Sequence, residues 1–587
     1  MVRRTPSGQA LVYAGSTRGL FRYRSSDPRA TTSQSSEWTS ILSGFINDLV
    51  VHPTNNSIVY AVRHVNPNVM DGIYRTKEAE ALQTDDPQNW KIIGSNPHQV
   101  PGWIAKIDLF RANPQKFYLL LFNKTPIPGS SNFRFEYWLY CSNNDGYNWS
   151  DVVTREFDSS MSHRSVQFLR AHPTIADCLY IGDIQLRKLF KWGIPGLSYW
   201  SNFVLIPNVN DDQQDLVFYP DGNNYLLATD GGVYRSQPYW FLGYFETMAG
   251  LNLGLEVAQF ADFDVSQTDP DLMVGGTQDT GNLRYIAAEP YGRWQSVSYA
   301  GDGGVCAIAP GKDSTIYANN ENGLLSTIMI SQDRGDTWNA VKPQGITDVG
   351  DVHLAVNPGD DKHILANGPK VQESSDFGSN WHLAGPDPTD HPELRGNIRC
   401  VVFDPIDPSR LWMAGTTQSG QLWRKDHGNW FPIIGHPDAG AIVQSIAFAP
   451  SNPDIVYVSY INCTPPFRLR RLARTWTEGG QIWSDQWITG NLPVIHEPLH
   501  SEVKTRWLIA HPGNADIVYV ATDKGVFRGQ FRLGLPGFGG WRWQPYNLGL
   551  PLVDVNKLIP VPLTGEIRAA TYGRGVWKVY PKDPTLP

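Results

Sequence analysis

The chain has 587 residues, of which 18% are charged, with 49 basic against 57 acidic side chains and a net charge of −8. This length exceeds what one hydrophobic core normally serves, so we expect two domains or one large repeat array. No strong basic run occurs, which argues against a nucleic-acid partner. The 54 Gly, 43 Pro and 21 Trp favour turn-rich β structure over helical bundles.

The sequence shows no sign of a metal centre, a disulfide framework or a membrane anchor. Its cysteines lie far apart, without a CxxC pair, at Cys141, Cys178, Cys306, Cys400 and Cys463. We therefore expect buried free thiols, no metal and no cofactor. The opening stretch MVRRTPSGQALVYAGS contains no apolar segment of signal-peptide length, and no transmembrane run follows. We expect no membrane partner and a location that is cytoplasmic, or outside the cell by a leaderless route.

A strand–turn–strand phrase recurs along the chain. Each copy has an apolar stretch, a turn rich in Pro, Asn or Asp, and a second apolar stretch that ends in a small residue. The clearest copies cover residues 46–61, 166–181, 401–415, 446–459 and 507–521. Each copy predicts two adjacent antiparallel strands.

A third strand, hinged by glycine, often follows the second. Such hinged strands cover residues 17–24, 71–76, 229–236, 522–529 and 572–579. Glycine allows the positive φ that a tight turn between two strands requires. A fourth, Trp-bearing strand then closes the unit.

One eight-residue turn occurs three times in altered spelling. The copies are SNNDGYNW (142–149), SQDRGDTW (331–338) and SSDFGSNW (374–381). A short polar side chain can fold back onto its own backbone amides, Gly can take a positive φ, and Trp then enters a core. The pattern predicts a hairpin turn anchored by an aromatic residue.

The spacing of these features predicts an all-β chain with a β-propeller fold. Successive units start about 43 to 61 residues apart, which is typical of four-stranded propeller blades, and there are eleven or twelve of them. The stretch from residue 11 has no strand in front of it. We therefore expect the chain to begin inside a blade, and residues 555–580 to supply the missing strand and close a ring.

These phrases carry a family resemblance. The eight-residue turn resembles the Asp-box (BNR) repeat, and TDGGVYRS, GGTQDTGNLR and GDGGVCAIAP resemble phrases of BNR-repeat propellers in the sortilin/Vps10-like and xyloglucan-hydrolase-like superfamily. The resemblance covers nearly the whole chain. It implies the fold, whereas such propellers include sialidases, xyloglucanases, receptors and assembly factors.

The resemblance implies two alternative arrangements. A xyloglucanase-like chain forms two tandem propellers of six or seven blades, here with an N-terminal propeller over residues 1–300 and a C-terminal propeller over residues 301–587. A sortilin-like chain forms one ring of ten or eleven blades. We expect the two-propeller arrangement.

Polar, Gly-rich phrases in the middle of the chain supply the candidate catalytic residues Asp230, Asp279 and Asp302, each beside an apolar strand. A glycosidase needs one carboxylic acid to protonate the leaving oxygen and one carboxylate to activate water or attack carbon. Asp279 is the strongest candidate, because its phrase TQDTGN differs from the hinge sequences TDGG and TDKG. The phrase also adds Gln278 and Asn282 as substrate-binding partners. The alternative is that each Asp is a turn residue that caps backbone amides.

The resemblance also implies a catalytic Asp elsewhere. In the xyloglucan-hydrolase family, a TDxGG-like phrase of the first blade carries the expected catalytic residue. Here the phrase is STRGLF, with Thr17 and Arg18 where that Asp would be. Asp230 stands in a phrase of this kind, TDGG, but in a later blade.

Aromatic insertions are the second functional signal. Residues 236–246 contain Tyr239 and Trp240, and residues 535–547 contain Trp541 and Trp543. Sugar faces stack on exposed aromatic rings, so we predict that these four residues bind substrate.

The segment FRLRRLARTW, residues 467–476, is a local arginine cluster. We interpret it as a solvated strand and loop, because runs of charge are usually solvent-facing.

Two functions stay open. The first is a carbohydrate-active protein, most concretely a glycoside hydrolase that acts on a polysaccharide or oligosaccharide in a cleft between propellers. The second is a non-catalytic, sortilin-like or assembly-factor-like propeller that binds a protein or peptide partner.

Overall fold

The structure is a computed structural model of the whole chain. It describes residues 2–4, 10–25, 38–66, 69–82, 84–85, 87–93, 104–130, 132–159, 166–194, 197–238, 246–252, 255, 257–287, 292–297, 301–320, 328–341, 344, 353–367, 370–385, 398–409, 412–416, 420–426, 428–464, 468–477, 480–490, 492, 503–532, 540–547 and 549–581.

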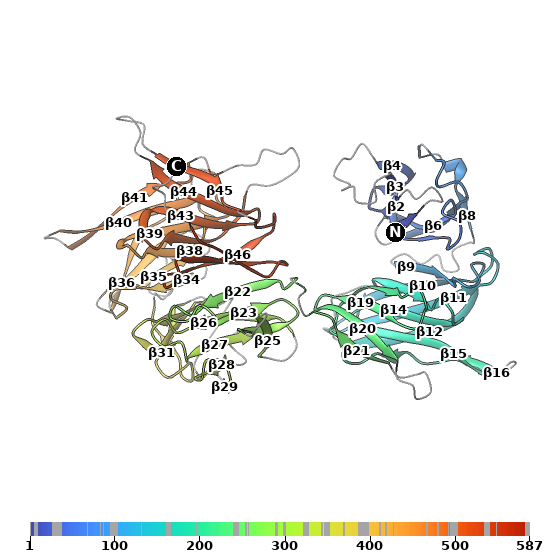
Figure 1. Cartoon of the computed structure of the whole chain (residues 1–587), viewed down its shortest axis with the longest axis horizontal. Coiled ribbons are helices and arrows are strands. Elements are labelled where there is room, and N and C mark those ends of the chain that lie inside the picture. The colour runs from blue at the N-terminus through green and yellow to red at the C-terminus, as the bar shows by residue number, and fades with distance from the viewer. Residues whose placement is uncertain are drawn as a thin grey trace. The chain divides into compact units, whose positions relative to one another are not determined.

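The described residues form antiparallel sheets, most of them four-stranded, in which the strands follow one another in chain order (Figure 1). This arrangement confirms the predicted all-β, multi-bladed propeller. The five strand–turn–strand phrases form the first two strands of five sheets, and the hinged phrases form third strands, as predicted. Among the described residues, no helix is long and apolar enough to span a bilayer.

Contacts between residues divide the chain into two compact units, Met1–Leu253 and Gly254–Pro587, here called unit 1 and unit 2. The sequence placed the division near residue 300. The earlier division arises because the sheet that begins at Phe260 packs against the last sheet of the chain, through a core that joins Phe263 to Val561 and Ala570.

Unit 1 contains five sheets within its described residues. Their strands are β1 (Val2–Arg4), β2 (Ala10–Gly15), β3 (Gly19–Ser25) and β4 (Trp38–Ser43); β5 (Phe45–Val51), β6 (Val59–Asn66), β7 (Val69–Thr76) and β8 (Lys91–Ile92); β9 (Ile104–Leu109), β10 (Phe117–Pro126), β11 (Phe133–Ser142) and β12 (Ser150–Ser159); β13 (Phe168–Ala171), β14 (Cys178–Gly182), β15 (Leu186–Ile194), β16 (Leu197–Trp200) and β17 (Val204–Leu205); and β18 (Gln213–Phe218), β19 (Tyr225–Thr229), β20 (Gly232–Pro238) and β21 (Glu246–Gly250). A single 3₁₀ turn, η2 (Pro87–Asn89), precedes β8 in this part of the chain that the structure describes.

Unit 2 contains seven sheets within its described residues. Their strands are β22 (Phe260–Val265), β23 (Met273–Thr277), β24 (Gly281–Ile286) and β25 (Arg293–Ser296); β26 (Gly303–Ile308), β27 (Ile316–Asn320), β28 (Ile328–Ser331) and β29 (Asn339–Val341); β30 (Leu354–Asn357), β31 (Asp360–Ala366), β32 (Gln372–Ser374) and β33 (His382–Leu383); β34 (Ile398–Phe403), β35 (Trp412–Thr416), β36 (Leu422–Asp426) and β37 (Asn429–Ile434); β38 (Ile442–Ala449), β39 (Asn452–Ile461), β40 (Leu469–Thr477) and β41 (Gly480–Trp487); β42 (Thr505–His511), β43 (Asn514–Thr522), β44 (Gly525–Arg532) and β45 (Gly540–Pro545); and β46 (Val555–Val561), β47 (Glu566–Thr571) and β48 (Val576–Val579).

Unit 2 closes on itself. The first strand of each sheet contacts the first strand of the next, and β46 of the last sheet contacts β22 of the first. Asn556 on β46 donates its side-chain amide to the backbone oxygen of Phe260 on β22, at 2.8 Å. Seven sheets thus complete a ring, so the chain does not form a single ring of ten or eleven blades.

The two ends of the chain differ from the prediction. β1 supplies a first strand to the N-terminal sheet by pairing with β2, so that sheet already has four strands. The C-terminal strands β46, β47 and β48 form a sheet of their own. The prediction that residues 555–580 complete the first blade is therefore wrong.

The second strands of several blades are buried on both faces, which explains their continuous apolar sequence. All of β14 and β23 and residues 117–122 of β10 are buried, and in β10 the side chains of Phe117, Leu119 and Leu121 face one core while those of Tyr118 and Leu120 face another. Consecutive side chains of a strand point to opposite faces. Each such strand therefore joins the core on one side of its sheet to the core on the other.

Aspartates on the first strands connect neighbouring sheets within each unit. In each case a carboxylate accepts a backbone N–H from the next first strand: Asp48 from Ile107 (2.9 Å), Asp108 from Ala171 (2.8 Å), Asp262 from Cys306 (3.0 Å) and Asp264 from Ile308 (2.8 Å). Burial raises the pKa of the carboxyls of Asp48, Asp108 and Asp264. These bonds fix the register between the sheets that they join.

The three copies of the eight-residue turn, the Ser-to-Trp turns, join the third and fourth strands of their sheets. In the copy at residues 374–381, the Ser374 hydroxyl donates to Asp376 at 2.8 Å and accepts the N–H of Gly378 at 3.0 Å. Asp376 also accepts the N–H of Asn380, and the indole N–H of Trp381 donates to the Gly378 oxygen. The copies at Ser331 and Ser142 repeat the serine and carboxylate or amide bonds. The predicted turn, with an aromatic anchor, is confirmed.

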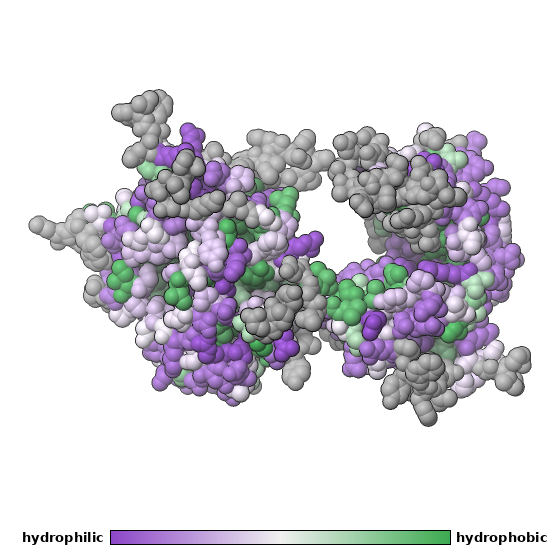
Figure 2. Space-filling model, viewed as in Figure 1, coloured by the Kyte–Doolittle hydropathy of each residue, from purple (hydrophilic) through white to green (hydrophobic). Residues whose placement is uncertain are grey.

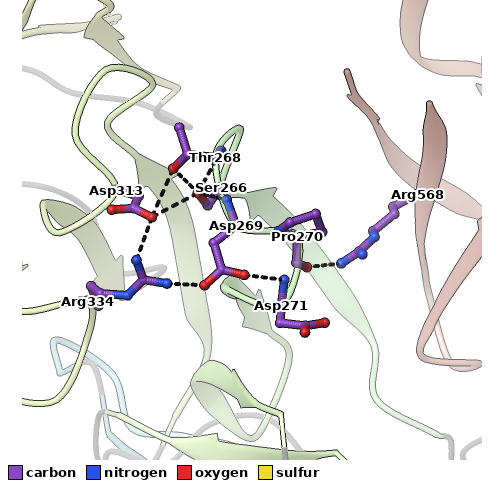
Figure 3. A network of polar contacts seen from close by, with 8 residues as sticks. All are labelled: Ser266, Thr268, Asp269, Pro270, Asp271, Asp313, Arg334 and Arg568. Carbon is purple, nitrogen blue, oxygen red and sulfur yellow. Dashed lines mark hydrogen bonds and ion pairs between the residues drawn. The ribbon is translucent and has the colours of Figure 1, made fainter. Parts of the chain in front are cut away.

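One Ser-to-Trp turn also links blades (Figure 3). Arg334 lies in the turn after β28 and pairs with Asp313 at 2.7 Å and with Asp269, which belongs to the loop between β22 and β23. In the same loop, the backbone oxygen of Pro270 accepts a hydrogen bond from Arg568 on β47. The loop of the first sheet is thus bonded to both the second and the last sheet of unit 2.

The face shown in Figure 2 is mainly hydrophilic, with hydrophobic residues in small separate groups. The large apolar side chains instead fill cores between successive sheets, for example Ile455, Leu508 and Val518 between β38–β41 and β42–β45. Candidate binding residues are therefore to be sought at the strand ends and turns.

Candidate functional site

A hydroxyl closes the hinge between the second and third strands of several sheets. The side chain of Thr522 donates to the backbone oxygen of Gly525 at 2.8 Å, and Thr571 donates to Gly575 at 2.7 Å. Thr277 makes the same bond to Gly281, at 2.7 Å, between β23 and β24. Asp279 lies within this last hinge, so the repeated architecture places it at a strand end.

Asp279 has an unusual backbone for a residue with a side chain. Its φ is 62°, in the left-handed region, where a non-glycine residue costs on the order of 1 kcal/mol. Asp tolerates this region better than most residues, and such strain is commoner at functional sites. Asp279 is partly exposed.

Asp302 meets this hinge from the next sheet. Its Oδ1 accepts the backbone N–H of Asp279 at 2.7 Å, and Gly281 and Asp302 form a parallel bridge. Asp302 directly precedes β26 and is partly exposed. Unit 2 therefore brings Asp279 and Asp302 together from adjacent sheets, through the backbone of one and the carboxylate of the other.

Glycines permit this close approach. A Cβ on Gly276 would lie 1.8 Å from the backbone oxygen of Gly304, and one on Gly303 would lie 2.2 Å from the backbone oxygen of Gly281. Real Cβ atoms essentially never approach another atom closer than 3.0 Å. The backbone contact between β23–β24 and β26, rather than any flexible side chain, positions the two aspartates.

Asp230 belongs to unit 1, in the hinge between β19 and β20. Its Oδ1 accepts a hydrogen bond from the side chain of Gln214, and the neighbouring Thr229 hydroxyl donates to the backbone oxygen of Gly232. Asp230 is partly exposed. A catalytic role for Asp230 stays a prediction.

The two polar neighbours of Asp279 differ in accessibility. Asn282 is buried, and its amide donates to the backbone oxygen of Asn319 at 2.9 Å and accepts from the Cys306 thiol at 3.5 Å. Both bonds lie inside the sheets, so the side-chain amide of Asn282 is already engaged there. Gln278 is partly exposed in the hinge and anchors it by donating its backbone N–H to Gln259.

Trp541 and Trp543 lie on β45 and are packed inside unit 2. They are 5% and 4% exposed, and the indole N–H of Trp543 donates to the backbone oxygen of Ile488 at 2.8 Å. Indole rings that are covered by a core present no face to a sugar, which corrects the substrate-binding prediction for both. Tyr239 and Trp240 lie outside the described residues.

A cavity of about 460 Å³ lies elsewhere in unit 2. Its lining includes four basic residues, Arg399, Arg468, Lys504 and Arg506, and, among the residues that the structure describes, no acidic one. The remaining walls include Gln444 and the strand end at Tyr460. Sequence reasoning did not find this cavity, because its residues come from three separate blades.

Bulges present three of the cavity residues. Each of β34, β38 and β42 contains one residue that is skipped in the pairing with the second strand, and these residues are Arg399, Gln444 and Arg506. A bulge re-aims a side chain and is frequent beside functional sites. Asn556 on β46 occupies the same kind of position, in the bond that closes the ring.

Arg468 and Arg470 belong to the arginine cluster that the sequence analysis interpreted as solvated. Both are 4% exposed, so that interpretation is wrong. Arg468 lines the cavity and donates to the backbone oxygen of Val503 at 3.1 Å, whereas Arg470 pairs with Asp485 at 2.6 Å. The available signal was Leu469 between the two arginines, because Arg468, Leu469 and Arg470 are all buried at the start of β40.

No model of a known protein family matches the chain, and no curated protein matches it. Two solved structures resemble it over nearly its whole length. A GH74 xyloglucanase from Xanthomonas campestris aligns with 98% of this chain and 89% of its own, at 15% identity and a TM-score of 0.57. An ancestral GH74 enzyme aligns with 100% of this chain and 92% of its own, at 12% identity and a TM-score of 0.60. At these identities the likeness establishes the fold.

Proposed function

We propose that the protein is a glycoside hydrolase of the Asp-box propeller kind that acts on a polysaccharide, with Asp279 and Asp302 as its carboxylate pair. The observation that carries the proposal is that unit 2 brings two partly exposed aspartates, Asp279 and Asp302, together at the ends of adjacent sheets, while one oxygen of Asp302 also caps the Asp279 amide. The whole-length likeness to a xyloglucanase and to a second GH74 enzyme supports the reaction class. The three Ser-to-Trp turns, with their serine and aspartate bonds, agree with the Asp-box resemblance.

The chemistry needs two carboxyl groups with different tasks. One protonates the oxygen of the leaving sugar, and the other activates water or attacks the anomeric carbon as a carboxylate. Both Asp279 and Asp302 are partly exposed, which gives a sugar access to them. The glycine contacts around them supply the rigid support that a catalytic pair requires.

The first-blade hinge explains why the pair is sought in unit 2. Ser16 closes the hinge between β2 and β3 by donating its hydroxyl to the Gly19 oxygen at 3.1 Å, as threonine does in other sheets. The residues inside that hinge are Thr17 and Arg18, so this position keeps its structural bond but has no carboxyl group. The hinges at Asp230 and Asp279 combine both features, and Asp279 is the one with a second candidate, Asp302, beside it.

The test is a screen for release of reducing sugar from soluble plant, bacterial and fungal polysaccharides. Asp279→Asn and Asp302→Asn are expected to lower the rate by about 10²- to 10⁴-fold, the usual contribution of an acid or base. Asp516→Asn is the matched control, because Asp516 is an exposed aspartate of the same unit. Circular dichroism and thermal unfolding of each variant verify the fold.

Activity that survives in both folded variants would refute the roles given to this pair. An inactive parent protein on every polysaccharide would instead favour the second function, a propeller that binds a protein or peptide partner.

A further inference from the structure

The basic cavity of unit 2 has the properties of a binding site for an anionic ligand. Arg399, Arg468, Lys504 and Arg506 line it without an acidic lining residue in the described part of the chain, although the chain as a whole has a net charge of −8. Its volume, about 460 Å³, falls in the range of small-molecule sites. Guanidinium groups suit carboxylates because their fixed donors match the two oxygens.

Two of these cations are held in place by neighbours. Arg506 bonds to both carboxylate oxygens of Asp554, at 3.1 and 2.6 Å. Arg468 is almost fully buried and donates to the backbone oxygen of Val503 at 3.1 Å. Their guanidinium groups are therefore oriented before any ligand arrives, which reduces the ordering cost of binding.

Gln444 gives a second, independent indication of a ligand. It is 9% exposed and lines the cavity, and its side-chain Oε1 has no hydrogen-bond partner among the described residues. A buried polar atom without a partner costs about 1 to 3 kcal/mol. This oxygen is covered as the side chain lies, so Gln444 must turn toward the cavity before a ligand hydroxyl can donate to it and remove the cost; the ligand should then carry a donor close to its anionic group.

We propose that this cavity binds a sugar carboxylate, that is, a hexuronic acid residue. Its carboxylate would lie among the basic side chains, and a ring hydroxyl would donate to Gln444. A simple inorganic anion would meet the charge but would leave the glutamine oxygen without its donor. A neutral sugar could donate a hydroxyl to Gln444 but would offer no anionic group to the basic side chains. The uronic acid combines both groups at short range.

The inference goes beyond the proposed hydrolysis, because none of the cavity residues takes part in the Asp279 and Asp302 pair. Binding is measured without turnover, so the two ideas can fail separately. An inactive protein can still bind uronate, and an active one can fail to bind it in this cavity.

The experiment is calorimetric titration of the full chain with glucuronate, galacturonate and their short oligomers. Glucose, glucose 6-phosphate, inorganic phosphate and an acidic peptide are titrated in parallel. We expect uronate to bind at least about tenfold more tightly than glucose and phosphate. The affinity should fall as NaCl is raised from about 0.05 to 0.5 M, because salt screens the exposed part of the cationic site.

Three variants and a control locate the site. Arg399→Gln removes a charge from the β34 bulge, and Gln444→Leu removes the unpartnered oxygen; each should weaken uronate binding about tenfold or more. Lys504→Gln is included because Lys504 is exposed, so its substitution leaves folding intact even where a buried variant fails. Arg542→Gln removes the same charge from an exposed position on β45 and should leave the affinity unchanged.

Several results would overturn the proposal. These are equal affinity for glucose and uronate, equal loss in Arg542→Gln and Lys504→Gln, or unchanged binding in both Gln444→Leu and Lys504→Gln. Tighter binding of glucose 6-phosphate or of the acidic peptide would also overturn it and would assign the cavity to a different anion.

Discussion

The ammonium group of Lys557 lies 2.6 Å from the Oδ1 of Asp262, and this pair joins the last sheet of unit 2 to the first. The other oxygen of Asp262 accepts the backbone N–H of Cys306 on the second sheet, at 3.0 Å. Although burial opposes the charge, the carboxylates of Asp262 and Asp264 raise the pKa of Lys557. One aspartate thus connects three consecutive sheets where the ring closes.

Lys557→Met should strongly destabilise unit 2. The substitution leaves the Asp262 carboxylate buried without its cation, which typically costs about 3 to 5 kcal/mol. The Lys557 ammonium lies 5.0 Å from the centre of the Trp507 ring, so this indole is a fluorescent reporter beside the substituted position. Unfolding in urea can be followed by tryptophan fluorescence. Lys578→Met is the control, since Lys578 is 59% exposed in its pair with Glu566 and should contribute less than about 1 kcal/mol. Equal effects of the two substitutions would contradict the role of Lys557 in closure.

The contribution of Asp264 to the stability of the protein should fall between about pH 4 and pH 6. Burial raises the pKa of this carboxyl from 3.8 to about 6, so in this interval the folded protein holds a proton that the unfolded chain has lost. The free energy of unfolding therefore decreases as the pH rises, by about 3 kcal/mol for this group, and is level above pH 6. Asp264→Asn should remove this contribution, so the difference in free energy of unfolding between parent and variant should change between about pH 4 and pH 6 in urea titrations at successive pH values. Parallel profiles for the parent and the variant would show that Asp264 does not titrate in this way.

Ser374→Ala should destabilise its turn although it removes a single oxygen. The buried hydroxyl accepts the N–H of Gly378 and donates to Asp376, so its loss leaves a buried amide without a partner, at about 1 to 3 kcal/mol. Ser484→Ala, at an exposed position on β41, should change the free energy of unfolding by less than about 0.5 kcal/mol. Similar urea midpoints for the two variants would rule out a structural role for the turn serine.

Gly276→Ala should disturb the Asp279 and Asp302 pair without altering either residue. The new Cβ would meet the backbone oxygen of Gly304 at 1.8 Å, so β23 and β26 must separate, at a cost of about 1 to 3 kcal/mol or more. We expect loss of polysaccharide hydrolysis together with a lower melting temperature. Gly540→Ala is the control, because nothing lies within 4 Å of a Cβ at that position. A Gly276→Ala protein with parental activity and melting temperature would refute the argument from close approach.

Local chemistry explains what the sequence alone could predict. The Ser-to-Trp turns and the threonine hinges depend on bonds between residues two to four positions apart, such as Thr522 to Gly525, so short patterns suffice to recognise them. The apolar second strands are equally visible, because both of their faces are covered. These features are enough to predict a propeller.

Long-range contacts explain what was missed. The bond from Asn556 to Phe260 decides where the ring of unit 2 closes, and no local pattern reveals it. The burial of Trp541 and Arg468 likewise depends on neighbouring blades, so an aromatic loop and an arginine run were both interpreted as more exposed than they are. Asp302 could be chosen as a candidate, but its bond to the backbone of Asp279 required the packing of two sheets.

The bulges at Arg399, Gln444, Arg506 and Asn556 have a consequence for how this protein can change. A skipped residue takes no part in the regular pairing of its strand, so its side chain can be exchanged while the register of the sheet is kept. Arg399, Gln444 and Arg506 face one cavity from three consecutive blades. The lining of this cavity can therefore be altered one blade at a time, by evolution or by design, without rebuilding the scaffold that carries it.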